Sequence, residues 1–431
     1  MDIKGVETMD YSKEVSIIIP TYNRVELLEF TLLSLYKQNF PINKFEVIVV
    51  NDCSTDGTKN FLNDLNPPFD LVVINNKKNQ GAAYSRNQGI KKAQGKLLIF
   101  LDEMLVDRNF IQSHLKYHVQ ENMVITTHFN GQRIFTHYYE NFSGKQKRLF
   151  KKTTLNLTSK KQVTIKKGVK RLIQPKKILN QEFMSYGLES KVISKWYTAL
   201  QAQYGMYLQR MAAPWYTFVT NGVSLSKALI EEAGLFDENF KGAWMEDWEL
   251  GLRLHQKGAI FYNAPDITCY HQNHPIGRDI KGTLINCLYF GEKYPFPEVM
   301  LIPTLSTSFK WTVESLGKTL TQFRQLERKD EDHYSQLLKA FKELILIFKL
   351  YIQDIVMDAN LPLLTDFQQG FVRWNPHFAP KVKEQLRRLE QEDYLSSNYS
   401  YFIKGFKDLL RLPIKNSKGV FYEKALYSGG L

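Results

Sequence analysis

Acidic side chains occur as adjacent pairs at two places where they could do chemistry. Asp102 and Glu103 follow the apolar run LLIFL, and Glu246 and Asp247 lie in the segment MEDWELG. A carboxylate can bind a divalent ion, accept hydrogen bonds or act as a general base. A single pair also has a simpler explanation, because acids stabilise turns and the first turn of a helix. The sequence around each pair must therefore decide between these roles.

Four polar clusters each follow a strand pattern or enter a helix pattern near the start of the chain. They are PTYNR, NDCSTDGT, NQGAAYSRN and LDEM. A nucleotide needs an acceptor for a base N–H, donors for its phosphates and an ion for its diphosphate. Asp52, Arg86 and the pair Asp102 and Glu103 could supply these groups. One Asp after a strand is more often a turn or cap residue, so the order of the four clusters is what favours a nucleotide site.

Alternating strand and helix patterns would place these clusters along one edge of a sheet. The predicted strands are the β-branched runs at 15–20, 45–50, 69–75 and 96–101, and helix patterns cover 23–39 and 81–95. Connections this short predict a parallel sheet covered by helices. Ligands of such sheets bind at the carboxyl ends of the strands. The first part of the chain is therefore predicted to be an α/β domain.

Composition excludes several protein classes. The 431 residues are 43% hydrophobic and 23% charged, which is typical of a soluble globular protein. Three cysteines, Cys53, Cys269 and Cys287, are too few and too scattered for a disulfide framework or a zinc cluster. No apolar run reaches the length of a membrane span, and the first residues lack a signal pattern. We expect a cytoplasmic protein, soluble or attached to a membrane surface.

The net charge of +13 is concentrated in one segment. Residues 145–177 contain 13 Lys or Arg residues and no acid. This segment could be a solvated loop or hairpin, or it could bind an anion such as a membrane lipid, a charged polymer or a nucleic acid. Nucleic acid is the weakest alternative, because no known nucleic-acid module accompanies the charge.

Five segments, in this order, resemble a family 2 glycosyltransferase with the GT-A fold. They are VSIIIPTYNR, VVNDCSTDGT, NQGAAYSRNQGI, FLDEM and NGVSLSKALIEEAGLFDENFKGAWMEDWELGLRLHQKG. The resemblance covers residues 14–275 and implies a Rossmann-like, mostly parallel sheet flanked by helices. We expect the nucleotide-sugar-binding half at 1–120 and the acceptor and catalytic half, with the basic segment, at 121–280. Amphipathic patterns predict a C-terminal α-helical region at 281–431.

The resemblance also implies roles for individual residues. Asp247 matches the catalytic base, with Glu246 beside it, and a base opposite the diphosphate predicts inversion at the anomeric carbon. Asp52 would accept a hydrogen bond from uracil. The residues expected around the rest of the donor sugar nucleotide are Pro20, Thr21, Asn23, Arg86, Asp102, Asn221, Gly222 and Trp244. Trp244 and Trp248 flank the second acidic pair and could present a sugar ring to it, although Trp248 is equally compatible with a core position.

The metal motif of the family is Asp-x-Asp, and LDEM resembles that motif with one residue missing. Neighbouring side chains on a strand point to opposite faces, so Asp102 and Glu103 would not both reach one ion unless the turn rotates Glu103 inward. Alternatively, only one of them is a ligand. His271 or His274 could add a nitrogen ligand, and His271 fits the position in the family better. We expect Mn²⁺ or Mg²⁺ held by Asp102, Glu103 and His271.

Together these features predict an inverting hexosyl- or N-acetylhexosaminyltransferase that uses a UDP-sugar. The expected acceptor is a cell-envelope glycan, a glycolipid or a protein, and the basic segment favours an anionic one. The alternative is a degenerate, non-catalytic protein that binds nucleotide sugars or serves in assembly. Two further expectations are peripheral contact with the inner face of the membrane and a homodimer formed through the C-terminal helices.

Overall fold

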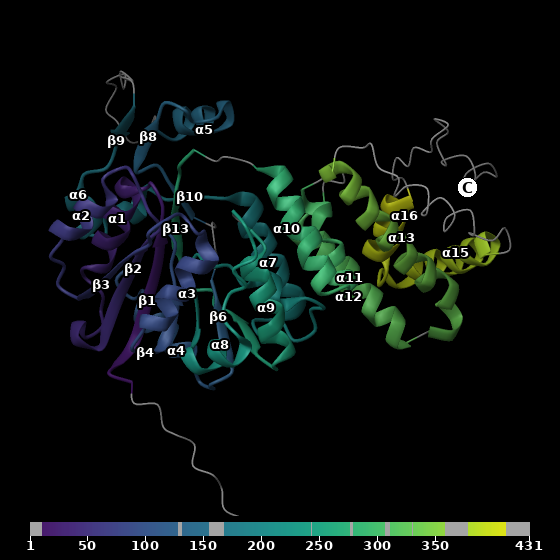
Figure 1. Cartoon of the computed structure of the whole chain (residues 1–431). Coiled ribbons are helices and arrows are strands. Elements are labelled where there is room, and N and C mark those ends of the chain that lie inside the picture. The colour runs from purple at the N-terminus through teal and green to yellow at the C-terminus, as the bar shows by residue number, and fades with distance from the viewer. Residues whose placement is uncertain are drawn as a thin grey trace, which may run out of the picture. The chain divides into compact units, whose positions relative to one another are not determined.

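The chain folds into two compact units, described by a computed structural model (Figure 1). The structure describes residues 11–127, 132–154, 168–242, 244–275, 279–306, 311–329, 331–357 and 378–410. Unit 1 comprises Met1–Gln209 and Pro214–Arg278, and unit 2 comprises Arg210–Ala213 and Asp279–Leu431. Every predicted site residue therefore belongs to unit 1. The predicted subdivision of this unit at residue 120 stays a prediction.

A seven-stranded, mostly parallel sheet forms the centre of unit 1. Its spatial order is β12 (Ile260–Asn263), β6 (Met123–Thr126), β11 (Val223–Ser226), β4 (Gly95–Phe100), β1 (Lys13–Thr21), β2 (Phe45–Asn51) and β3 (Asp70–Asn75). Only β11 runs antiparallel to its neighbours β4 and β6. The predicted fold class is confirmed, because helices flank this sheet and a helical region follows it.

Alternation along β1 explains how helices cover both faces of the sheet. Ile17 and Ile19 belong to the same core cluster as Leu28 and Leu32 of α1 (Val25–Leu35). Ile18 points the other way and contacts Gly89 of α3 (Ala82–Lys92). A Cβ on this glycine would lie only 2.5 Å from Ile18 Cγ2. Successive side chains of a strand face opposite sides, so three consecutive isoleucines serve two layers of core.

The remaining helices of unit 1 are mostly short. They are α2 (Thr58–Asp64), α4 (Phe110–Tyr117), α5 (Gly144–Thr154), α6 (Pro175–Leu179), α7 (Lys191–Tyr204), α8 (Lys227–Ala233), α9 (Glu246–Gln256) and the 3-10 turns η1 (Ile42–Lys44), η2 (Glu182–Tyr186) and η3 (Pro214–Thr217). A second sheet has the order β10 (Leu188–Glu189), β7 (Gln132–Ile134), β13 (Cys269–Gln272) and β5 (Met104–Val106).

The described residues of the basic segment, 145–154 and 168–177, lie largely in regular elements. They include α5, the strand β9 (Val169–Arg171), which pairs with β8 (His137–Tyr139) in a two-stranded antiparallel sheet, and the first residues of α6. The lysines of this segment at 160, 161, 166 and 167 lie outside the described residues.

Unit 2 is helical, as expected from its amphipathic patterns. Its helices are α10 (Ile280–Lys293), α11 (Pro297–Met300), η4 (Ile302–Leu305), α12 (Val313–Lys329), α13 (Glu331–Met357), α15 (Phe378–Ser396) and α16 (Ser400–Leu410). The Phe341 ring lies 5.0 Å from the rings of both Phe323 and Phe402, so α12, α13 and α16 share an aromatic core. In the described part of the chain, no helix has both the length and the apolar character needed to cross a bilayer. The predicted homodimer through these helices stays a prediction.

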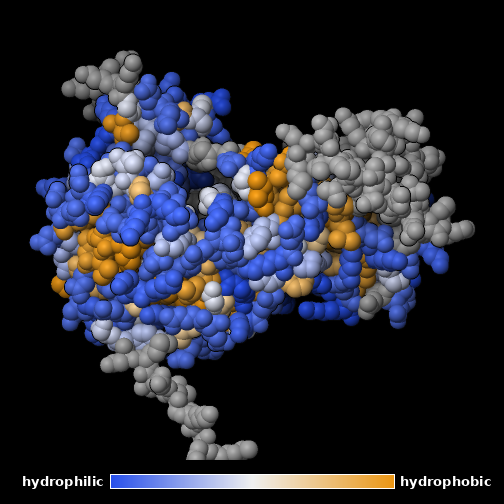
Figure 2. Space-filling view, viewed as in Figure 1, coloured by the Kyte–Doolittle hydropathy of each residue, from blue (hydrophilic) through white to orange (hydrophobic). Residues whose placement is uncertain are grey.

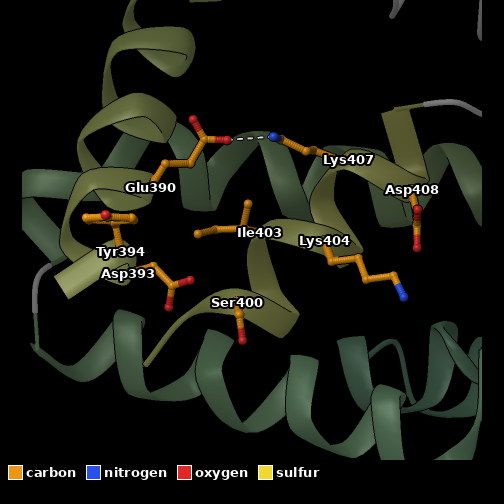
Figure 3. Close-up of a pocket in the computed structure, with 8 residues that line it drawn as sticks. All are labelled: Glu390, Asp393, Tyr394, Ser400, Ile403, Lys404, Lys407 and Asp408. Atoms are coloured by element: carbon orange, nitrogen blue, oxygen red, sulfur yellow. Dashed lines mark ion pairs between the residues drawn. The ribbon is translucent and has the colours of Figure 1, made fainter. Parts of the chain in front are cut away.

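An open pocket lies between α15 and α16 of unit 2 (Figure 3). Its walls carry both signs of charge, and an ion pair joins Glu390 to Lys407 across it with an N–O distance of 2.6 Å. The other lining residues are Asp393, Tyr394, Ser400, Ile403, Lys404 and Asp408. None of the predicted site residues is among them, so this pocket is separate from the candidate site.

Candidate functional site

The carboxyl ends of β1, β2 and β4 gather the residues predicted to bind a nucleotide. Pro20 and Thr21 end β1, Asp52 follows β2, and Asp102 comes two residues after β4. Because these strands are parallel neighbours, their ends meet at one edge of the sheet. The strand pairing therefore brings three of the four polar clusters, PTYNR, NDCSTDGT and LDEM, to one edge, and their role in nucleotide binding stays a prediction.

The turn after β1 is tied to the loop after β2. The backbone N–H of Asn23 donates to Ser54 Oγ at 2.9 Å, and its side-chain oxygen accepts from the backbone N–H of Thr55 at 2.7 Å. Asn23 has φ of 52°, a left-handed conformation that Asn tolerates better than most residues. Tyr22 beside it is 46% exposed, so its ring is accessible to a ligand.

Asp52 is buried and organises the loop that leads into α3. Its carboxylate accepts hydrogen bonds from the side-chain amide of Asn76 at 2.7 Å and from the backbone N–H groups of Gln80 at 3.0 Å and Gly81 at 2.8 Å. These bonds use most of the acceptor capacity of one carboxylate. The predicted contact with uracil stays a prediction, and Asp52 has a structural task beside it.

Replacing Asp52 with Ala is expected to weaken UDP binding by about tenfold or more, because the loss leaves several buried donors without an acceptor and loosens the loop at 76–81. Isothermal titration with UDP, with and without a divalent ion, measures this effect. Asp64→Asn, at an exposed position in α2, is the control and should bind UDP normally. Unchanged UDP affinity in Asp52→Ala would remove this residue from the site.

Arg86 joins acids that are far apart in the sequence. Its side chain is buried and donates from Nη1 to Glu246 Oε1 at 2.9 Å and from Nη2 to Asp102 Oδ1 at 3.1 Å. Its guanidinium also lies 5.5 Å from the centre of the Phe236 ring. Burial alone would lower the pKa of Arg86, but the carboxylates of Asp102 and Glu246 raise it above its usual value. Arg86 thus remains charged and connects the two acidic pairs.

The second acidic pair begins α9 after two residues in an unusual conformation. Trp244 and Met245 have φ of 86° and 85°, and residues other than Gly and Asn adopt such values only at a cost of about 1–3 kcal/mol each. Backbone strain of this kind concentrates at functional sites. Trp244 is 64% exposed, whereas Trp248 is buried with its ring 4.9 Å from that of Tyr216. Of these two tryptophans, Trp244 is the accessible one, and its contact with a sugar stays a prediction.

Asp247 and Glu246 differ in their surroundings. Asp247 is half-buried, and its Oδ1 accepts from the backbone N–H of Trp248 at 2.8 Å. Burial and the neighbouring charge of Glu246 raise the pKa of Asp247 to about 8. Glu246 is buried, and its Oε2 has no hydrogen-bond partner among the described residues. A carboxyl with a pKa near neutrality suits proton transfer, and an unpaired buried oxygen suits a ligand hydroxyl.

Asn221 and Gly222 lie directly before β11, next to the first acidic pair. Val223 pairs with Phe100, two residues before Asp102, in antiparallel register. Gly222 has φ of 126°, and a Cβ there would lie only 2.4 Å from Cys269 Sγ. Glycine is required at this point, which keeps the backbone close to β13 and beside the acidic motif.

The first acidic pair is held by two arginines. Asp102 binds Arg86, while Glu103 accepts from Thr21 Oγ1 at 3.2 Å and from Arg24 Nη1 at 3.3 Å. Arg24 Nη1 also lies 3.3 Å from His274 Nε2. His274 Nδ1 donates to the carbonyl oxygen of Pro275, so Nε2 is the acceptor for Arg24. Sequence reasoning did not single out Arg24, although it directly follows PTYN.

The predicted metal ligands Asp102, Glu103 and His271 do not form a ligand set. Across the described ranges, no three His, Cys, Asp or Glu side chains gather around a point that could hold an ion. Both carboxylates point to arginines, and His271 Nδ1 is buried without a partner among those residues. Burial and the positive charge of Arg24 lower the pKa of His274 to about 4, which leaves its imidazole neutral at pH 7, with Nε2 in contact with Arg24. In the arrangement described, these side chains do not converge on one ion position, so we derive no step through an ion, and the binding of Mn²⁺ or Mg²⁺ stays a prediction.

Comparison with known proteins agrees with the geometry. The model of glycosyl transferase family 2 matches residues 16–178. The "uncharacterized glycosyltransferase YfnE" of Bacillus subtilis (strain 168) is 32% identical over 409 residues, which cover 94% of this chain and 99% of the relative. A validoxylamine A glucosyltransferase of Streptomyces hygroscopicus subsp. jinggangensis (strain 5008) is 26% identical over 308 residues, or 70% of this chain and 64% of the relative.

Solved structures share only a weak likeness. The mannosyltransferase PcManGT from Pyrobaculum calidifontis, in complex with GDP-Man and Mn²⁺, is 15% identical and has a TM-score of 0.41, with coverage of 94% of this chain and 91% of that chain. A similarity this low carries no argument about ligands. The YfnE match, which spans nearly the whole of both sequences, and the family model within unit 1 identify the chain as a member of glycosyltransferase family 2.

Proposed function

We propose that the protein transfers a hexose or N-acetylhexosamine from a UDP-sugar to a glycan acceptor, with inversion at the anomeric carbon. The observation that carries this proposal is the chain of contacts from Asp102 through Arg86 to Glu246, the residue beside Asp247. It connects the strand ends, where a nucleotide is expected, with the carboxylate next to the proposed base. The glucosyltransferase name of the Streptomyces relative supports a hexose as the transferred group.

Asp247 is the proposed general base. In its ionised form it would take the proton from the attacking acceptor hydroxyl while the bond to the diphosphate breaks on the opposite face of the sugar. Because the pKa of Asp247 is raised to about 8, the basic form grows as the pH rises through that value. The unpaired Oε2 of Glu246 would accept a hydrogen bond from a hydroxyl of the donor sugar, which fixes the sugar next to the base.

Donor contacts are proposed for the strand ends. Asn23, Asp52 and the exposed ring of Tyr22 would surround the uridine, and Arg86 would lie close to the diphosphate. Asn221, Gly222 and Trp244 would line the sugar and the acceptor cleft. The predicted cytoplasmic location and the contact with a membrane surface stay predictions.

A second candidate function has one observation in its favour. Both acids of the shortened LDEM motif are neutralised by arginines of the chain, as expected if this motif no longer serves transfer. The protein would then bind a nucleotide sugar without turning it over. A binding protein has no need for a carboxyl with a raised pKa, so we place this alternative second.

Donor hydrolysis across a panel of UDP-, GDP- and TDP-sugars, each with Mn²⁺, Mg²⁺ or EDTA, separates the two functions. Turnover of one UDP-sugar is the expected result. Glu103→Ala should reduce it, because this change frees Arg24 and removes the acceptor of Thr21. Tight UDP binding without hydrolysis or transfer to any added glycan under every condition would support the non-catalytic alternative.

A further inference from the structure

A basic helix, α5, lies beside the candidate site and has no ion-pair partner among the described residues. α5 carries Lys145, Lys147, Arg148, Lys151 and Lys152 within 11 residues and no acid. Within the part of the chain that the structure describes, none of these five forms an ion pair, whereas Arg171 and Lys177 nearby pair with Glu29 and Glu182. Four of the five are exposed, and the surface over α5, at the top of Figure 2, is hydrophilic.

Several charges of α5 oppose its stability, although Lys151 and Lys152 lie in the last turn, where the helix dipole favours cations. Lys147 and Lys151 lie four residues apart, as do Arg148 and Lys152, so like charges meet on the helix surface. Lys145 and Lys147 also lie in the first turn, where the helix dipole disfavours cations. An external anion would relieve both effects. This arrangement therefore indicates a binding surface better than a simple solvated face.

Aromatic packing fixes α5 in place with its charges outward. The Phe150 ring lies 5.3 Å from Phe135 and 5.0 Å from Tyr138, and Phe142 completes this cluster. Because this packing buries the apolar side of α5, the helix presents no apolar face that could insert into a lipid surface. Its single aromatic residue is buried, so it offers no ring for stacking of nucleic-acid bases.

One hydrogen bond connects α5 to the candidate site. The side-chain amide of Gln146 donates to the carbonyl oxygen of His274 at 2.7 Å. His274 contacts Arg24, which binds Glu103 of the first acidic pair. Three successive contacts thus connect the helix to Glu103, which is adjacent to the predicted donor residue Asp102. A polymer that lies along α5 could extend into the reaction site.

We propose that α5, with the adjoining two-stranded sheet of β8 and β9, is the acceptor-binding surface and that the acceptor is a glycan polymer with a negative charge in each repeat. This inference rests on the proposed transferase function. The helix extends over about 16 Å at 1.5 Å per residue, a length that suits several charged repeats in preference to one phosphate. Lysine ammonium groups bind as point charges, so phosphodiester and uronate repeats both satisfy the surface.

The test compares two variants of the full chain that lose the same charge. The first is K145Q/R148Q/K151Q/K152Q, which changes the exposed cations of α5. The matched control, K37Q/K59Q/K91Q/K92Q, removes four exposed lysines from other helices of unit 1 or their ends. The probes are a glycerol phosphate oligomer, an oligogalacturonate, neutral dextran, single-stranded DNA and vesicles of phosphatidylglycerol. Binding is measured at several salt concentrations, together with UDP binding and donor hydrolysis.

The expected result is salt-dependent binding of an anionic oligomer that falls by about tenfold or more in the α5 variant and less than about twofold in the control. Preference between the phosphate and the uronate oligomer identifies the kind of repeat. UDP binding should be unchanged, and thermal unfolding should show that the α5 variant is folded. Equal binding by both variants would overturn the proposal, as would binding of DNA or vesicles alone. A wild type that binds the oligomer without any turnover would instead contradict the proposed transferase.

Discussion

Asp247→Asn is expected to lower the rate of sugar transfer by about 10²–10⁴-fold while UDP still binds, because removal of a general base typically costs that much. Asparagine keeps the size of the side chain and can still accept from the backbone N–H of Trp248. Single-turnover transfer and isothermal titration with UDP measure the two effects separately. The control is Asp64→Asn, which lies in an exposed position of α2 and should transfer normally.

The pH dependence gives a second readout for the same residue. The pKa of Asp247 is raised from its ordinary 3.8 to about 8 by burial and by Glu246, so its basic form is scarce at acidic pH. Wild-type transfer should rise with pH and level off above about 8. A pH profile without this rise, or full activity of Asp247→Asn, would contradict the assignment of the base.

The contribution of Asp247 to stability should fall as the pH rises, whereas transfer activity should increase. A carboxyl whose pKa is raised by folding favours the folded state when protonated, and this advantage is lost as the pH rises from 3.8 towards about 8. The amide of Asp247→Asn does not titrate. The melting temperature of this variant relative to wild type should therefore increase over that range and stay constant above it.

Arg86→Met is expected to be the most destabilising change in the site, by about 3–5 kcal/mol in the free energy of unfolding. Its guanidinium is buried between Asp102 and Glu246, and its loss leaves two carboxylates without their compensating charge. Urea unfolding measures the effect. Transfer should also fall in molecules that remain folded, because Glu246 beside the base is no longer held.

Two further variants test whether the destabilisation by Arg86→Met comes from its buried ion pairs or from the loss of any arginine. Arg171→Met breaks an ion pair with Glu29 that is partly exposed, and should cost no more than about 1 kcal/mol. In Arg86→Met combined with Glu246→Gln, one of the two unpaired charges is gone, so part of the stability should return. If Arg86→Met lowered the free energy of unfolding as little as Arg171→Met does, the stabilising role of the Asp102–Arg86–Glu246 network would be contradicted.

Local patterns in the sequence were sufficient for the parallel strands β1 to β4 and for the polar residues at their carboxyl ends. β-branched runs such as 15–20 and 45–50 have few other structures available to them, and polar residues at their ends must meet at one edge. The antiparallel direction of β11 was not predicted, because side-chain alternation along a strand carries no information about the direction of its neighbours.

Long-range contacts were beyond the reach of the sequence. Arg86 and Glu246 are 160 residues apart, and Arg24 and His274 are 250 apart, so no spacing indicates that they touch. Trp248 could have been a core or a sugar-binding residue, and only packing against Trp215 and Tyr216 decides for the core. In α5, the helical spacing of Gln146, Leu149 and Phe150 was hidden by the surrounding lysines.

The four residues Arg210–Ala213 have a consequence for any attempt to separate or exchange the two units. They belong to unit 2, where the backbone N–H of Ala212 donates to Thr321 Oγ1 at 3.1 Å and Met211 is buried near Gly317. A protein cut after residue 278 would expose Met211 and remove the acceptor of Ala212. A chimera that replaces the helical unit with that of a relative must therefore exchange two segments, Arg210–Ala213 and Asp279–Leu431.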